Sequence, residues 1–260
     1  MSGNLWIDSL RNLASIFLLA LSSYQDVKIR EIDDIIWWAF IIAAFGLNLL
    51  DSFLGGTDPL NWIMSATLQS ILFVVLYYLG LFGGADAKAF LCLSFIYPTS
   101  LALFLSNLAN ARLTTAVSTF SNAMILSMAY LPMNLFRNIS LHLGGNNLFE
   151  GLEQESSIRK VAALLLLRKI ERSEFISNRQ KYLIGQHRKH DNRIELTFSR
   201  DIAEDAQKTE LDPDLTYVFA SPLMPLQVFI LIGLIFYLIG GDILLSSSLW
   251  LARTLRGQGI

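Results

Sequence analysis

Long apolar runs dominate the first half of this chain and limit what it can fold into. Between Asn4 and Leu135 these runs carry almost no charge, whereas residues 137–222 are polar and residues 224–246 are apolar again. Charged residues make up 16% of the 260 positions, against about 25% in soluble domains. Because a helix needs roughly 20 apolar residues to cross a bilayer, the sequence predicts a polytopic membrane protein with one large polar insertion.

Six segments are candidate spans, and they define the predicted domains. The predicted fold class is an all-α polytopic membrane protein of six transmembrane helices, with an α/β or α+β insertion between the fifth and sixth. The expected parts are 1–137 with the first five helices, 138–221 as a cytoplasmic soluble insertion, and 222–260 as the last helix and tail. The six spans are Leu5–Tyr24, Ile35–Leu54, Leu60–Phe82, Ala87–Asn107, Leu113–Phe136 and Met224–Ser246.

The polar insertion contains shorter patterns of its own. Ser156–Phe175 includes seven consecutive apolar residues flanked by basic ones, too few to cross a bilayer. We expect an amphipathic or core helix there. Ile194–Phe198 is a candidate strand, and the acidic Asp201–Asp214 is expected to form a loop broken by Pro213.

Basic residues predict the orientation of the spans. Lys28, Arg30 and Lys88 fall on one face of the six-span arrangement, and the face richer in Lys and Arg is normally cytoplasmic. Both termini are then outside. One result is independent of orientation: Asp26 follows the first span and Asp86 precedes the fourth, so both lie at the same membrane face.

Asp26 and Asp86 are the candidate catalytic residues. A carboxylate beside hydrocarbon is costly and by default indicates function. Two such carboxylates can share one proton and activate a water molecule, as in aspartic proteases. Asp8 and Arg11, one turn apart, are expected to form an ion pair. Asp242 lies about 18 residues into the last span, near the opposite face, and is expected to serve helix packing.

Residues around the two aspartates are candidates for substrate binding. Glycine permits positive φ and close backbone approach, so an extended substrate could lie against the turn before Asp86. Acids near Asp26 could attract a basic substrate segment, although two of them could instead cap the second helix. The predicted substrate-binding residues are Gly83, Gly84, Lys88, Glu31, Asp33 and Asp34.

The composition argues against several other chemistries. The single cysteine, Cys92, allows neither an intrachain disulfide nor a CxxC zinc site, and no HExxH or GxSxG motif occurs. We therefore predict no metal and no cofactor. The net charge is −2 and basic patches interleaved with aromatic residues are missing, so we expect no nucleic-acid partner.

The two aspartate motifs resemble those of a known family. Residues 26–34, DVKIREIDD, look like the first motif of type IV prepilin peptidases, and residues 83–88, GGADAK, resemble their second, the GxGD motif. The resemblance covers most of the chain and is greatest for the archaeal preflagellin peptidase branch. Ala85 departs from the third position of GxGD. The Cys-rich zinc segment of the bacterial branch is missing, so N-methylation is not expected.

The resemblance implies a membrane aspartic endopeptidase. Its substrates would be preflagellins or prepilin-like proteins, which carry a short basic leader before a hydrophobic helix. Cleavage would use Asp26 and Asp86, without a cofactor, at the cytoplasmic face of the plasma membrane, with the lipid bilayer as the protein's surroundings.

Two other functions remain open on the sequence. A presenilin-like intramembrane protease shares the GxGD motif, but such proteins have more spans and a tyrosine before the first aspartate, where this chain has Gln25. A small transporter or assembly protein could also use two loop acids to bind a cation or a partner. Cleavage of a purified prepilin would distinguish these functions.

Overall fold

The computed structural model describes residues 4–99, 113–145, 147–149, 152, 154–188, 194–198, 216–243, 247 and 254. The chain forms two compact units, residues 1–127 with 225–260, and residues 128–224.

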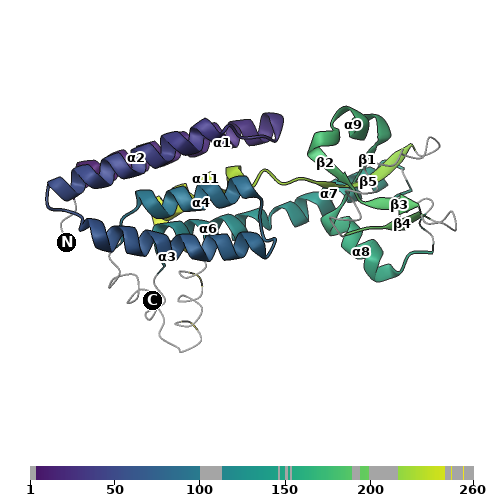
Figure 1. The fold of residues 1–260 in the computed structure, drawn as a ribbon. Helices are drawn as coiled ribbons and strands as arrows, with labels where there is room; N and C mark the ends of the chain where they lie inside the picture. Colours follow the sequence, from purple (N-terminus) through teal and green to yellow (C-terminus); the bar gives the residue numbers. More distant parts are fainter. Residues whose placement is uncertain are drawn as a thin grey trace. The chain divides into compact units, whose positions relative to one another are not determined.

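The first unit is a set of helices that run side by side (Figure 1). Within the described residues, α1 to α3 are long and apolar enough to cross a membrane. The sequence-based expectation of a mostly helical, membrane-type chain is therefore confirmed at this level. The helices are α1 (Leu5–Ile29), α2 (Asp34–Phe53), α3 (Pro59–Tyr78), α4 (Gly84–Ile96), α6 (Thr115–Ser127) and α11 (Leu226–Gly240).

Three expected spans differ from the helices observed. The described part of the fourth, α4, has 13 residues, and residues 100–112 lie outside the description. The segment Leu113–Phe136, expected as one helix, is two: α6 and α7 (Tyr130–Leu143). Pro132 explains the break, because proline cannot donate a hydrogen bond to the preceding turn. The last helix, α11, has 15 residues and ends at Gly241, whose φ of 82° suits glycine.

Aromatic and small residues hold the first unit together. The rings of Phe73 and Phe90 stack with centroids 4.8 Å apart, and Phe120 packs edge-on against Phe90 at 5.4 Å. This joins α3, α4 and α6. Helices α6 and α11 approach closely at Gly233, where an added Cβ would lie 2.8 Å from the Thr119 carbonyl oxygen. Small residues allow such close helix packing in membranes.

A buried ionic network lies where the start of α1 meets the end of α2. The Arg11 guanidinium lies 2.6 Å from Asp8 and 2.9 Å from Asp51, and it donates a 2.7 Å hydrogen bond to Asn48. The Arg11 side chain is 2% exposed. The expected Asp8–Arg11 pair is confirmed, whereas the partners from α2 were not foreseen.

The second unit combines helices with two small antiparallel sheets. In the larger sheet β5 lies between β1 and β2, with Ile170 opposite Val218 and Leu183 opposite Ser221; in the smaller sheet β3 pairs with β4. After α7, its elements are α8 (Ser157–Leu166), β1 (Arg168–Glu171), α9 (Arg172–Ser177), a 3-10 turn (Arg179–Lys181), β2 (Tyr182–Ile184), β3 (Gln186–Arg188), β4 (Ile194–Leu196) and β5 (Tyr217–Pro222).

Two expectations for this unit can be compared with the structure. Ser156–Phe175 is not one helix, because α8 ends at Leu166 and the chain continues as β1. Asn138 of α7 secures this change of direction: its side chain donates to the Leu167 carbonyl at 2.8 Å and accepts from the Lys169 N–H at 3.0 Å. The strand expected near Ile194 is confirmed as β4. Residues 201–214, expected as a loop, lie outside the described residues.

Candidate active site

The two motif aspartates come together at one end of the first unit, through a third residue. Asp26 is in the last turn of α1, and Asp86 is in the first turn of α4. Gln227, at the start of α11, contacts both. Its backbone N–H donates to Asp26 Oδ2 at 3.4 Å, and its side-chain Nε2 donates to Asp86 Oδ1 at 2.9 Å. Three helix ends therefore form the site.

The turn before α4 holds the Asp86 carboxylate. The Gly83 N–H donates to Asp86 Oδ2 at 3.1 Å, so the aspartate caps its own helix. Gly83 has φ of −77° and ψ of 167°. This is extended backbone, which any residue can adopt. What the glycine provides is space, because an added Cβ would lie 3.3 Å from Asp86 Oδ2.

Asp86 lies outside the helices that are long enough to cross a membrane. Burial raises the pKa of its carboxyl group to about 6, and the hydrogen bond from Gly83 opposes that rise. The nearby charge of Asp26 raises the pKa further, and the Gln227 hydrogen bond lowers it. A carboxyl group with this pKa exchanges its proton near neutral pH, as general acid–base chemistry requires.

Asp26 has a cationic neighbour within its own segment. Arg30 Nη1 lies 3.5 Å from Asp26 Oδ1, and the two side chains are 16% and 15% exposed. Arg30 ends α1 in the left-handed conformation, with φ of 60°. The two side chains therefore form an ion pair at the end of α1.

The acids predicted to bind substrate are mostly engaged with other groups. Asp34 lies 2.5 Å from the Lys88 ammonium, and both side chains are exposed. Asp33 accepts from Gln25 Nε2 at 2.6 Å and donates its N–H to Gln25 Oε1 at 2.8 Å. Asp33 precedes α2, but its carboxylate does not cap that helix. Glu31 is exposed in the connecting loop.

Gly84 lies at the start of α4 beside the aspartate site, whereas Asp242 lies beyond the other end of α11. At Gly84 an added Cβ would meet Tyr77 at 3.8 Å, an ordinary contact. Asp242 follows the opposite end of α11 from Gln227, where it is buried and accepts a 3.5 Å hydrogen bond from Ser121 of α6. Asp242 is therefore remote from the two motif aspartates.

A groove of about 230 Å³ opens between α2 and α4. The Asp34–Lys88 ion pair stands at this groove, and Lys88 follows Asp86 by two residues. Apolar side chains form most of its wall. The residues that line it are Asp34, Trp37, Trp38, Ile41, Lys88, Leu91 and Cys92.

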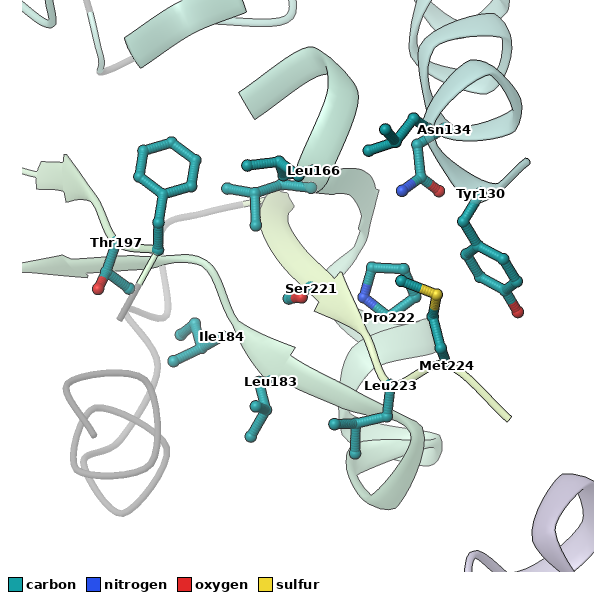
Figure 2. Close-up of a pocket in the computed structure, with 13 residues that line it drawn as sticks. Tyr130, Asn134, Leu166, Leu183, Ile184, Thr197, Ser221, Pro222, Leu223 and Met224 are labelled. Carbon is teal, nitrogen blue, oxygen red and sulfur yellow. The ribbon is translucent and has the colours of Figure 1, made fainter. Parts of the chain in front are cut away.

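A second pocket, of about 280 Å³, belongs to residues 128–224 (Figure 2). Tyr130 and Asn134 of α7 contribute to it, together with strand residues such as Ile184 and Ser221. Its wall is largely apolar and contains no carboxylate or histidine. This pocket wall therefore offers no acid–base pair of the kind that Asp26 and Asp86 form.

Gln227 and Ser22 are the site residues that sequence reasoning missed. Gln227 is 0% exposed, and its Oε1 accepts a 3.1 Å hydrogen bond from the Ser22 hydroxyl. One signal was available: Gln227 is the polar residue in an otherwise apolar run, LQVFILIGLIFYLIG. Among the described residues no cluster of three or more His, Cys, Asp or Glu side chains is arranged to hold a metal ion.

Comparison with known proteins supports one family. The model of the type IV leader peptidase family matches residues 13–136, which include both aspartate motifs. No curated protein matches this chain. This stretch is therefore similar to type IV leader peptidases, and helices α1 to α3 are long and apolar enough to cross a membrane.

Proposed function

We propose that this protein is a membrane aspartic endopeptidase that removes the short basic leader from preflagellins or other prepilin-like proteins. The observation that carries the proposal is the joint contact of Gln227 with Asp26 and Asp86. Two motifs separated by 60 residues of sequence supply carboxylates to one small, partly buried place. Similarity to the type IV leader peptidase family over residues 13–136 supports a peptidase.

The proposed reaction uses one shared proton. Burial of Asp86 favours its protonated form, and Asp26 is given the role of the ionised partner, because two adjacent carboxylates share one proton. Asp26 accepts a proton from water as the water oxygen attacks the scissile carbonyl carbon. Asp86 donates its proton to the carbonyl oxygen, which gives a neutral gem-diol. Asp26 then donates its proton to the amide nitrogen while Asp86 takes a proton back from a gem-diol hydroxyl. The C–N bond breaks, and the leader is released with a new carboxyl terminus.

The groove between α2 and α4 is proposed to receive the apolar segment that follows the cleavage point. Trp37, Trp38 and Leu91 supply an apolar wall, and Lys88, which also lines the groove, follows Asp86 by two residues in α4. A cysteine placed at Ile41, which also lines the groove, should crosslink to a cysteine in that substrate segment. A cysteine at Leu68 of α3, exposed on the apolar surface, is the matched control.

The proposed membrane arrangement has six spans, an insertion of residues 138–221 and an active site at the cytoplasmic face. Glu31 lies exposed in the loop beside the site, so Glu31→Cys reports its side of the membrane. A membrane-impermeant maleimide should label it in inside-out vesicles and not in right-side-out vesicles. The native Cys92 is buried and should give little background.

Cleavage by the purified protein in detergent tests the proposed function. The substrate is a prepilin-like protein with a basic leader. Asp26→Asn and Asp86→Asn should each lower kcat at least about a thousandfold, because an amide cannot cycle the proton. Asp58→Asn is the matched control: Asp58 caps α3 through Leu60, and asparagine caps equally well. Full cleavage by either motif mutant would exclude the aspartic mechanism.

A further inference from the structure

Gln227 is fully buried, and every polar group of its side chain is engaged. Nε2 donates to Asp86 Oδ1 at 2.9 Å, and Oε1 accepts from the Ser22 hydroxyl at 3.1 Å. Its backbone N–H, in the first turn of α11, donates to Asp26 Oδ2. Because Gln227 is 0% exposed and Ser22 is also 0% exposed, substrate and bulk water have little access to this amide.

The amide has two arrangements that satisfy the same neighbours. The Ser22 hydroxyl lies 3.1 Å from Gln227 Oε1 and 3.0 Å from the Leu19 carbonyl oxygen. Its one proton can point to either acceptor. If it points to Leu19, the Ser22 oxygen can accept from a rotated Gln227 amide. The rotated amide then presents its carbonyl oxygen, and not its N–H, to Asp86.

These two arrangements match the two protonation states of Asp86. An ionised carboxylate accepts only and needs a donor, whereas a protonated carboxyl group can donate through its O–H. The observed arrangement supplies the N–H that the ionised form needs, and the rotated one supplies an acceptor for the protonated form. Lysine can only donate hydrogen bonds and methionine donates none, so neither residue could switch between donating to Asp86 and accepting from it.

Resting on the proposed function, we infer that Gln227 is a positioning residue that holds Asp86 in place in both protonation states by rotating its amide against Ser22. Its backbone N–H holds Asp26 at the same time, so the start of α11 sets the separation of the two carboxylates. Gln227 transfers no proton itself. Its loss should therefore change kcat and leave KM nearly unchanged.

Several other groups near Asp86 can affect its titration. Asp26 faces it from the end of α1 with Arg30 beside Asp26, and the Asp34–Lys88 pair lies between α2 and α4. Tyr77 of α3 lies close to Gly84, which shares the first turn of α4 with Asp86. All of these groups are retained in the variants of Gln227, so a changed titration is assigned to the amide.

Gln227→Met is the first variant, because methionine keeps the length of the side chain and removes its hydrogen bonds. It should lower kcat about tenfold or more, and the alkaline limb of the pH profile should move up by about one unit, since a lost hydrogen bond to an ionised group destabilises that ion. Gln69→Met is the matched control. Gln69 is equally buried in α3, where it accepts from Thr114 at 2.6 Å, remote from both aspartates.

Gln227→Glu separates positioning from a general packing role. A protonated glutamic acid has one donor and one acceptor and can replace the amide, whereas its ionised form cannot donate to Asp86. The kcat of Gln227→Glu should therefore approach the wild-type value as the pH falls, whereas the kcat of Gln227→Met should stay below the wild-type value. If Gln227→Met matches wild type in kcat and pH profile, or changes no more than Gln69→Met, the inference is wrong.

Ser22→Ala decides the matter if the Gln227 variants do not fold, as judged by Tm. It removes one hydroxyl on the far side of the amide and should lower kcat several-fold, with a shifted alkaline limb; wild-type values would overturn the inference.

A second readout is independent of cleavage. The infrared C=O band of protonated Asp86, assigned with Asp86→Asn, should titrate at higher pH in Gln227→Met than in wild type. If Asp26→Asn cleaves normally, the proposed function fails, whereas the infrared shift still tests Gln227.

Discussion

The ammonium group of Lys88 lies 2.5 Å from the carboxylate of Asp34, so an ion pair joins the segments that follow the two motif aspartates. Both side chains are about half exposed or more, at 49% and 70%. Such a pair contributes little to folding, about 0–1 kcal/mol, and salt weakens it. Its consequence for function is that the negative charge of Asp34 is largely compensated.

Removing the positive charge of Lys88 should favour cleavage of substrates that carry a basic leader. Lys88→Met leaves the Asp34 charge unopposed, and we expect kcat/KM for a substrate with a basic leader to rise a few-fold relative to one with a neutral leader. Asp34→Asn should have the opposite effect, and Glu31→Gln should also lower the ratio. The double variant Asp34→Lys with Lys88→Asp restores neutrality and is the control. A ratio indifferent to all four changes, or to added salt, would contradict electrostatic recognition.

The pH dependence should follow the protonation of Asp86. Burial raises the pKa of this carboxyl group to about 6, above its unfolded value of about 3.9. The acid form required for catalysis is therefore present below pH 6 and lost as the pH rises through that value. We expect kcat/KM to decline on the alkaline side with a midpoint near 6. Asp34→Asn should leave the midpoint in place, and a decline confined to pH below 4 would refute the assignment.

Gly83 and Gly84 should respond differently to the same substitution. In Gly83→Ala the new Cβ lies 3.3 Å from Asp86 Oδ2, so the carboxylate must shift by a few tenths of an ångström. In Gly84→Ala the nearest atom is 3.8 Å away. Small displacements of catalytic groups are costly, and we expect kcat to fall about tenfold in the first variant and little in the second. Equal kcat values would show that the Gly83 turn tolerates a side chain.

The buried network at the other end of the first unit should control stability. Asp51→Ala leaves Arg11 buried without its main partner from α2, and breaking a buried pair costs about 3–5 kcal/mol. Asp8 is half exposed, so Asp8→Ala should cost only about 0–1 kcal/mol. Thermal unfolding in detergent measures both. Cleavage per folded molecule should stay unchanged, because Asp26 and Asp86 lie at the opposite helix ends.

The apolar runs and the order of the motifs were sufficient to predict part of this molecule. Helices α1, α2 and α3 lie where the hydropathy placed them, because a segment rich in apolar residues must satisfy its backbone internally in lipid. That Asp26 and Asp86 lie at one end followed from counting crossings between them. The contacts with Gln227 place both at that end.

Contacts between distant segments were decided by the tertiary structure. Gln227 lies 141 residues from Asp86, and in the sequence it is one polar residue at the start of an apolar helix. Arg30 could have paired with any acid of its loop, and the structure places its guanidinium 3.5 Å from Asp26, at the left-handed end of α1. Local patterns report burial and charge, whereas a hydrogen bond depends on the packed positions of both partners. The sequence therefore determined helices α1 to α3 and identified the two aspartates, and packing determined which groups contact those aspartates.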